Sequence, residues 1–136
     1  MRFIFVCSFL SSVFIPAASV ADDKWVLAAR SFNGTEIFVY LDEVMDVGDL
    51  LYAKTLMNHS FREDTGELSS VSEDVISCSR KMIKTTRMAT YSEKFAKGRR
   101  LSNDDLVKLQ LDMWQSPVSG SVLFEYVVRL CSHFGR

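Results

Sequence analysis

Two cysteines, Cys78 and Cys131, place the strongest covalent limit on how this chain can fold. A third, Cys7, lies in an N-terminal stretch typical of a cleaved secretory leader, so it is absent from the mature fold. An exported chain meets an oxidising compartment, where a lone pair of cysteines usually forms a disulfide. The bond would close a loop of more than fifty residues and stabilise the fold by about 4 kcal/mol in the chain-entropy model. Two buried free thiols, or a redox or metal site, are the alternatives.

Residues 1–21 have the pattern of a signal peptide. Arg2 supplies a positive charge, a mostly apolar run follows, and Ser19 and Ala21 are the small residues that precede a cleavage site. The run is too short to cross about 30 Å of hydrocarbon, which disfavours an anchor helix. No cysteine stands at the cleavage point, so we expect no lipid anchor. We therefore predict an exported protein, periplasmic or secreted, with one domain over residues 22–136 and no transmembrane segment.

The composition is that of one globular domain. Of the 136 residues, 48% are apolar and 24% are charged, which excludes a disordered or fibrous chain. The length suits one domain rather than two. The net charge of −1 gives no general attraction to nucleic acid, so we predict no nucleic-acid partner.

Alternating apolar residues and turn signals predict an antiparallel sheet through most of the mature chain. The strands are expected at residues 25–30, 35–41, 50–57, 75–79, 81–91 and 98–102, with loops over 42–49 and 58–72. Asn33-Gly34 separates the first two strands and predicts a hairpin with a type I′ turn, in which both residues have positive φ. The strand at 75–79 would carry Cys78.

The last element has a clear helical pattern. Ser121 is a suitable N-cap, and nothing interrupts a helix over residues 122–133. Its apolar residues recur on one face: Leu123, Val127, Leu130, Cys131 and Phe134. This places Cys131 on the buried side, where Cys78 could meet it. The prediction is an α+β fold: an antiparallel sheet of about five or six strands, with the C-terminal helix packed on one face and tied by the disulfide.

Residues 103–113 are ambiguous. Ser102 with Asp105 resembles a capping box, which indicates a helix. From Val107 to Met113, however, apolar and polar residues alternate strictly, as in a strand. We favour extended structure slightly.

The charges are strongly segregated along the chain. The segment from residue 36 to residue 74 contains ten acidic residues and only two basic ones, Lys54 and Arg62. The segment from residue 80 to residue 100 contains only one acidic residue, Glu93. It contains eight basic residues: Arg80, Lys81, Lys84, Arg87, Lys94, Lys97, Arg99 and Arg100. These eight are the candidate binding residues for an anionic partner. Two structural alternatives are that acidic and basic strands pair across the sheet, or that both are solvated faces.

Motifs for catalysis, metal binding or nucleotide binding are absent from the sequence. His59 and His133 have no partner at a spacing typical of a catalytic or metal site. We therefore predict no enzyme, no metal and no cofactor.

The sequence resembles the bacterial surface-adhesin protein E-like family. The shared features run through most of the mature chain: Trp25, Tyr40-Leu41-Asp42, Cys78, Arg80, Tyr91-Ser92, Gly98, Trp114, Gly120-Ser121, Glu125 and Cys131. The resemblance implies an antiparallel sheet with a C-terminal helix held by this disulfide, in the envelope of a Gram-negative bacterium. The founding adhesin of the family binds host extracellular-matrix proteins and is lipid-anchored, whereas this leader lacks the lipidation cysteine.

On this resemblance, the first functional hypothesis is an exported, non-enzymatic binding module whose ligand is a host matrix protein or an anionic glycan. An exposed sheet edge could also form a homodimer. The alternative is a periplasmic accessory protein, such as an inhibitor or folding partner of another envelope component.

Overall fold

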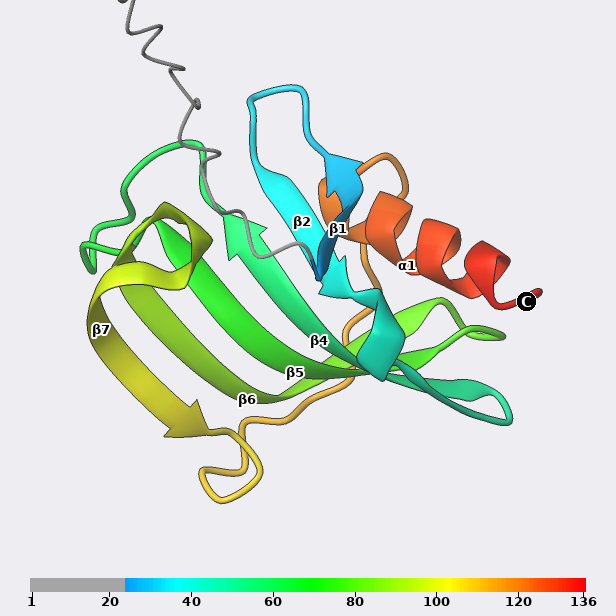
Figure 1. Ribbon diagram of the computed structural model, residues 1–136. Coiled ribbons are helices and arrows are strands. Elements are labelled where there is room, and N and C mark those ends of the chain that lie inside the picture. The colour runs from blue at the N-terminus through cyan, green and yellow to red at the C-terminus, as the bar shows by residue number, and fades with distance from the viewer. Residues whose placement is uncertain (1–23) are drawn as a thin grey trace, which may run out of the picture.

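The computed structural model describes residues 24–136, so the predicted leader at residues 1–21 lies outside the described part. One antiparallel sheet has the order β1-β2-β4-β5-β6-β7, and β3 pairs with β4 off this path (Figure 1). The strands are β1 (Trp25–Arg30), β2 (Glu36–Tyr40), β3 (Met45–Val47), β4 (Leu50–Asn58), β5 (Ser69–Ser77), β6 (Met82–Glu93) and β7 (Lys97–Asp105). Helix α1 (Val122–His133) follows and packs mainly on β1 and β2. The predicted α+β fold with its C-terminal helix is confirmed.

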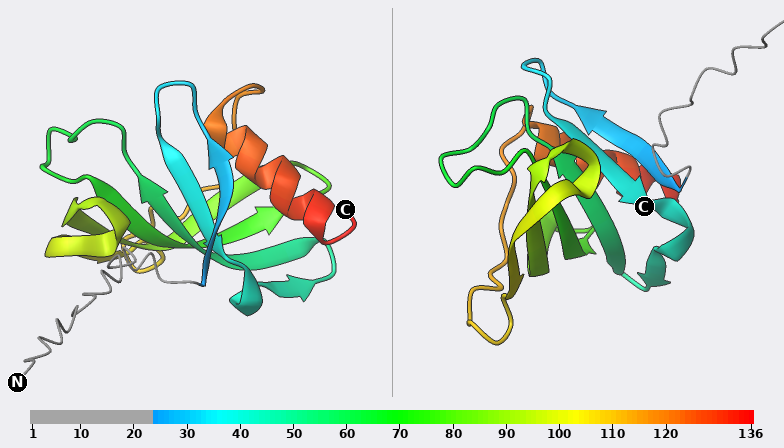
Figure 2. Two further views of the ribbon diagram at one scale, coloured as in Figure 1. Left: turned by 45° about the horizontal axis from the view of Figure 1, so that its top comes forward. Right: turned by 60° about the vertical axis from the view of Figure 1, so that its left-hand side comes forward.

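Figure 2 shows the turn between β6 and β7 at the opposite end of the sheet from α1, whereas β6 starts beside the helix, where Ile83 joins the core. Within residues 24–136, no helix combines the length and the apolar character needed to cross a bilayer.

The hairpin between β1 and β2 forms as predicted, but its turn is of a different type. The N–H of Gly34 donates to the carbonyl of Ser31 over 3.1 Å, which centres the turn on Phe32 and Asn33. Gly34 has φ +95°, whereas Asn33 does not have positive φ. The type I′ prediction is therefore wrong. Ser31 explains the difference, because its hydroxyl accepts from the N–H of Thr35 and closes a longer loop.

The strands differ from the prediction at β5 and β3. Strand β5 begins at Ser69 rather than residue 75, and pairs along its whole length with β4 and β6. A central strand satisfies its backbone on both sides, so its ladder extends through the mostly polar residues 69–74. Cys78 lies in the turn directly after β5, not within the strand. The short strand β3 forms inside the segment predicted as a loop.

Residues 106–113 are neither a helix nor a strand. Strand β7 ends at Asp105, whose side chain accepts from the N–H of Lys108 and whose carbonyl accepts from that of Leu109. A compact turn follows, and the chain then crosses to β6, where Gln115 and Ile83 exchange two backbone hydrogen bonds of 2.8 and 3.0 Å. Asp105 itself therefore caps a turn, and no helix continues from it. Ser102, the N-cap of the capping box indicated by the sequence, lies within β7 instead, where its hydroxyl pairs with that of Thr90. The preference for extended structure holds only as far as Asp105.

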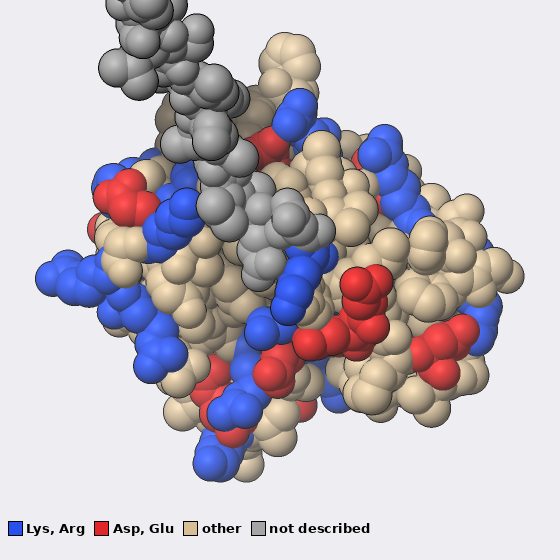
Figure 3. All heavy atoms as spheres, viewed as in Figure 1, with Lys and Arg blue, Asp and Glu red and all other residues tan. Residues whose placement is uncertain are grey.

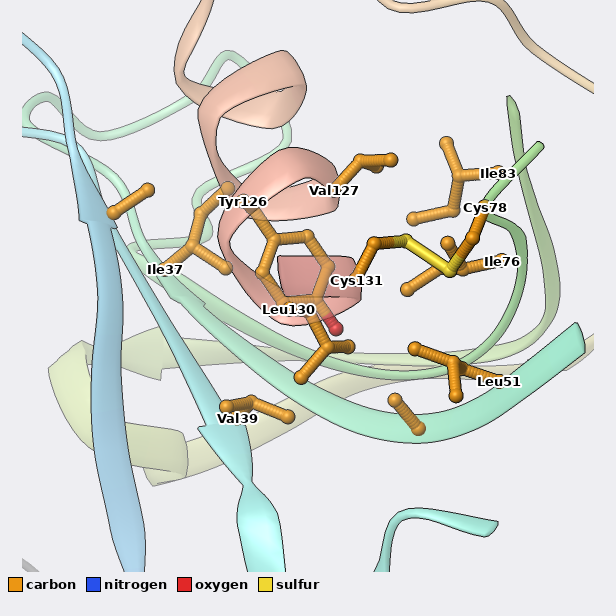
Figure 4. Packing of buried hydrophobic residues seen from close by; sticks show 12 residues of the cluster. Ile37, Val39, Leu51, Ile76, Cys78, Ile83, Tyr126, Val127, Leu130 and Cys131 are labelled. Atoms are coloured by element: carbon orange, nitrogen blue, oxygen red, sulfur yellow. A yellow bond between two sulfur atoms is a disulfide. The ribbon is translucent and has the colours of Figure 1, made fainter. Parts of the chain in front are cut away.

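The core lies between α1 and one face of the sheet, here called the helix face (Figure 4). Ile37, Leu51 and Ile76 come from three different strands and are fully buried. Tyr126 and Val127 meet them from α1 and are also fully buried. Ser121 caps the helix by accepting from the N–H of Phe124, as predicted. The helical spacing of apolar residues thus places one face of α1 in the core.

The disulfide joins Cys78 to Cys131, as predicted, and ties α1 to the turn after β5. Asp49 holds this turn from the neighbouring hairpin. Its carboxylate accepts from the hydroxyls of Ser77 and Ser79 and from the N–H of Ser79, over 2.7 to 2.9 Å. These hydrogen bonds keep the pKa of Asp49 below its ordinary value. The crosslink is therefore anchored by a charged hydrogen-bond network on the strand side.

Candidate functional site

The structure divides the eight basic candidate residues among three places. Arg80, Lys81 and Lys84 lie in the turn before β6 or near its start, and Arg87 lies in its middle. The other four follow its end: Lys94, Lys97, Arg99 and Arg100. Twelve residues of strand span at most about 40 Å, so one small ligand cannot reach both ends of β6.

Two of the three cations near the start of β6, Arg80 and Lys84, are compensated by their neighbours. The guanidinium of Arg80 lies 5.0 Å from the ring centroid of Trp114, and the ammonium of Lys84 lies 5.1 Å from it. Lys84 also lies 3.9 Å from a carboxylate oxygen of Asp112. Both cations therefore fasten the segment after β7 onto the sheet. Lys81 is exposed and has a φ of +50° in the turn.

Arg87 lies in register between two acidic residues, Glu73 on β5 and Asp105 on β7. Glu73 is in turn in register with Lys54 on β4. Charges of opposite sign thus alternate across four strands, as in the alternative of cross-strand pairing.

The four remaining residues, Lys94, Lys97, Arg99 and Arg100, lie together and are called the basic end here. The turn that carries them, η2 (Lys94–Ala96), is held by buried polar groups of the sheet. The amide oxygen of Asn58 accepts from the N–H of Phe95 over 2.8 Å, and the hydroxyl of Ser69 accepts from that of Ala96 over 3.0 Å. Asn58 and Ser69 are both fully buried. The basic end is thus built on a fixed turn.

An aromatic contact and a glycine complete the turn. The ring of Phe95 packs on Phe38 with 5.5 Å between centroids, on the face of the sheet opposite α1. Gly98 has φ +76°, and a Cβ at this position would collide with the side chains of Ser92 and Glu93. Glycine is therefore required for the chain to turn back into β7.

The four cations of the basic end form no ion pair in the described chain, although Lys97 lies in register with Glu93 on β6. All four residues are exposed, and Figure 3 shows Lys and Arg side chains gathered over β7. The result is a positive surface at one edge of the sheet.

Arg62 borders this surface, and the sequence analysis did not single it out. Its guanidinium donates to the carbonyls of Gly66 and Ser92 over 2.8 and 2.7 Å, and lies 3.8 Å from Glu93. No local signal indicated it, because it stands within the acidic run. The loop that carries Arg62 also contains three acidic residues: Glu63, Asp64 and Glu67.

The helix face contains a buried carboxyl. Asp74 accepts from the hydroxyl of Thr85 over 2.7 Å and from that of Ser72 over 2.9 Å. Burial raises its pKa, although these hydrogen bonds act in the opposite direction. Nearby, the hydroxyls of Thr55 and Tyr126 lie 2.8 Å apart, and burial raises the pKa of Tyr126.

The histidines do not form a recognisable catalytic or metal centre. Nδ1 of His59 lies 3.5 Å from Glu63, and the ring of His133 packs edge-on against Phe134. In the part of the chain that the structure covers, no three His, Cys, Asp or Glu side chains are placed to hold a metal ion.

Comparison with known proteins identifies the fold and the family. The chain is similar to protein E of Haemophilus influenzae in crystal form II, with a TM-score of 0.61 and 13% identity, covering 84% of this chain and 91% of that one. A second structure of Haemophilus influenzae protein E gives a TM-score of 0.59 at 12% identity, over 83% and 87% of the two chains. Protein E from a non-typeable strain gives 0.59 at 13% identity, over 86% and 81%.

No match is found among curated proteins. The family model for surface-adhesin protein E, however, matches residues 25–132, which include every described strand and most of α1. The chain therefore belongs to the surface-adhesin protein E family.

Proposed function

We propose that this protein is an exported, non-enzymatic binding module of the bacterial cell envelope that holds an anionic partner at its basic end. The observation that carries the proposal is the exposed positive charge of that end, which lies outside every ion pair of the described chain, on the fold of a surface-adhesin family. The partner class is a sulfated glycan or an acidic face of a host matrix protein. Export requires a cleavable leader, and we include the leader predicted at residues 1–21 in the proposal.

The structure supports this mode of binding in two ways. First, η2 is fixed by Asn58, Ser69 and the Phe38–Phe95 contact, so little conformational freedom is lost when a partner binds. Second, the four cations attract an anionic partner over a Debye length of about 8 Å at physiological salt. Binding should therefore weaken as salt rises.

Heparin chromatography tests the proposal. The double variant Lys97→Gln/Arg99→Gln removes two charges from the basic end, and we expect it to elute at clearly lower salt than the wild type. A matched control is Lys81→Gln/Lys108→Gln, which removes the same charge from exposed positions elsewhere. The control should elute close to the wild type. Equal elution of the two double variants, or retention independent of salt, would refute the role of the basic end.

The cellular part of the proposal has its own test. Fractionation of the producing cell should place the protein outside the cytoplasm, with an N-terminus at Asp22 after cleavage. Display on the cell surface together with binding to matrix protein supports the adhesin role. Confinement to the periplasm together with co-purification of one envelope protein would instead support the accessory role.

The predicted homodimer is restricted by the charges on the sheet edges. Strand β7 is one edge of the sheet, and pairing two copies of it would bring Lys97, Arg99 and Arg100 close to their own equivalents. Strand β3 has only three residues, so the proposed dimer uses the longer edge strand β1, where Val26 and Leu27 are 44% and 43% exposed. Light scattering of the wild type and of Leu27→Lys tests this assignment, because the charge should dissociate such a dimer.

A further inference from the structure

The helix face of the sheet is only partly covered by α1. The helix packs on β1 and β2, whereas parts of β4, β5 and β6 line a hollow of about 310 Å³ on the same face. The segment after β7 forms the opposite wall and is pinned to the sheet by the Ile83–Gln115 pair. The volume lies at the lower end of the range for small-molecule pockets.

The walls of the hollow are apolar. They are formed by three methionines and three leucines: Met57, Met88, Met113, Leu106, Leu111 and Leu123. At the mouth, Leu111 and Met113 are 60% and 70% exposed, so these apolar side chains reach the opening without cover from other described residues. Methionine adapts its shape to irregular apolar groups. The walls therefore suit the apolar body of a small ligand.

The floor of the hollow is polar. It consists of four hydroxyl-bearing residues and one carboxyl: Thr55, Ser70, Ser72, Thr85 and Asp74. The hydroxyls of Ser72 and Thr85 donate to Asp74 and leave the hydroxyl oxygens able to accept. Of the floor residues, Thr55, Ser70 and Asp74 are buried. A ligand that reaches the floor would thus need a group that donates hydrogen bonds.

The charges around the hollow also select the ligand. No Lys or Arg is among the lining residues, whereas Asp74 and Glu67 are. His59 lies in the wall as well, and its Nε2 is buried without a hydrogen-bond partner in the described part of the chain. A carboxylate or phosphate would meet no fixed positive charge here, while an amine or hydroxyl would meet acceptors.

We propose that this hollow binds a small amphiphile, with its apolar body among the methionines and leucines and an amine or hydroxyl group against the Asp74 floor. The site is independent of the basic end, because η2 packs on the opposite face of the sheet through Phe38 and Phe95. Failure of ligand binding in the hollow would therefore leave the function proposed for the basic end unaffected, and the reverse also holds.

Fluorescence titration with N-phenyl-1-naphthylamine, a neutral aromatic amine, tests the site directly. We expect saturable enhancement at one probe per chain. Three compounds with the same alkyl chain then compete for the site: octylamine, 1-octanol and octanoate. The amine and the alcohol should displace the probe at concentrations at least tenfold lower than octanoate. Absence of saturation, or octanoate as effective as octylamine, would overturn the proposal.

Variants locate the binding in this hollow. Met88→Trp fills it from β6 and should weaken probe binding at least tenfold. The matched control is Met82→Trp, which adds the same ring on the opposite face of the same strand and should bind as the wild type. Equal binding by both variants would contradict the assignment.

Two further variants keep the test decisive if Met88→Trp fails to fold. Leu111→Asp changes only an exposed side chain at the mouth and should weaken the probe without unfolding the protein. Asp74→Asn retains the shape of the floor and should reduce the preference for octylamine over octanoate. If neither variant changes binding, the probe does not occupy the hollow.

Discussion

The two ends of β6 carry similar basic residues but use them differently. Near the start of the strand, Arg80 and Lys84 lie over Trp114, and Lys84 also has Asp112 as a partner. Beyond the end of the strand, Lys97 and Arg99 are free of ion pairs within residues 24–136. The comparison teaches that basic residues close together in the sequence do not necessarily form one positive surface. Its function depends on what the fold places beside each residue.

The same contrast holds for covalent structure. Strand β6 starts after the turn that contains Cys78 and Ser79. A disulfide joins Cys78 to α1, and the N–H of Ser79 donates a hydrogen bond to Asp49. The other end of β6 has no crosslink, and its turn is held by neutral hydrogen bonds to Asn58 and Ser69. We therefore expect substitutions near the start of β6 to change stability, and substitutions at the basic end to change binding.

Loss of the disulfide should have the largest effect. The double variant Cys78→Ser/Cys131→Ser should lower the free energy of unfolding by about 4 kcal/mol, because the bond closes a loop with a sequence separation of 53 residues. Urea unfolding of the variant and of the oxidised wild type measures the difference. Reduced wild type is the control and should match the variant. A change below about 1 kcal/mol would show that the core holds α1 without the bond.

Trp114 should come second. Trp114→Ala should lower the free energy of unfolding by about 2 kcal/mol, because it removes a half-buried ring and two cation–π contacts. Trp114→Phe keeps an aromatic face for both cations and should recover part of the loss. If the two variants were equally destabilised, the cations would not contribute through the ring.

Asp49 should show a smaller, pH-dependent effect. Its pKa is lowered in the folded state, so its contribution is present above the ordinary carboxyl pKa and is lost as the pH falls through the lowered value. Asp49→Asn should therefore have a lower Tm than the wild type at pH 7, and the gap should shrink below about pH 4. Asp64→Asn, in an exposed loop, is the control and should show no such gap. A constant gap across pH would contradict a role for the charge.

The sequence predicted the antiparallel sheet, the C-terminal helix and the disulfide, because these follow from patterns along the chain. Alternation, turn residues and helical spacing are visible along the chain, and of the three cysteines only Cys78 and Cys131 lie outside the predicted leader. The extension of β5 was missed because its polar residues, such as Ser69 and Asp74, are satisfied by hydrogen bonds to β6, which no alternation of apolar residues indicates. The alternating segment up to Met113 was misassigned for a similar reason. Its apolar side chains line a hollow or face solvent instead of a sheet.

The candidate site was only partly predictable. The basic run was evident, but its division depended on Trp114 and Asp112, which reach β6 through the Ile83–Gln115 pair. Arg62 belongs to the acidic run of the sequence, but a hydrogen bond to the carbonyl of Ser92 places it beside the basic end. Such neighbours are set by tertiary structure and leave no spacing signal in the sequence.

The smallest effect on stability is expected at the basic end itself. Lys97→Ala and Arg99→Ala should each change the free energy of unfolding by less than about 0.5 kcal/mol, because both side chains are exposed and lie outside any ion pair in the described chain. Removing like charges that lie close together can even stabilise the fold slightly. Thermal and urea unfolding measure the change, and Gly98→Ala, in the same turn, is the positive control for damage to its backbone.

The two ends of β6 are compared most directly when stability and heparin binding are both measured on one variant from each end. Arg80→Ala should lose stability, because its guanidinium lies over Trp114, but keep its heparin elution. Arg99→Ala should show the reverse pattern. If Arg99→Ala were as destabilised as Arg80→Ala, the basic end would be part of the folded framework, and its charge could not be assigned to a partner.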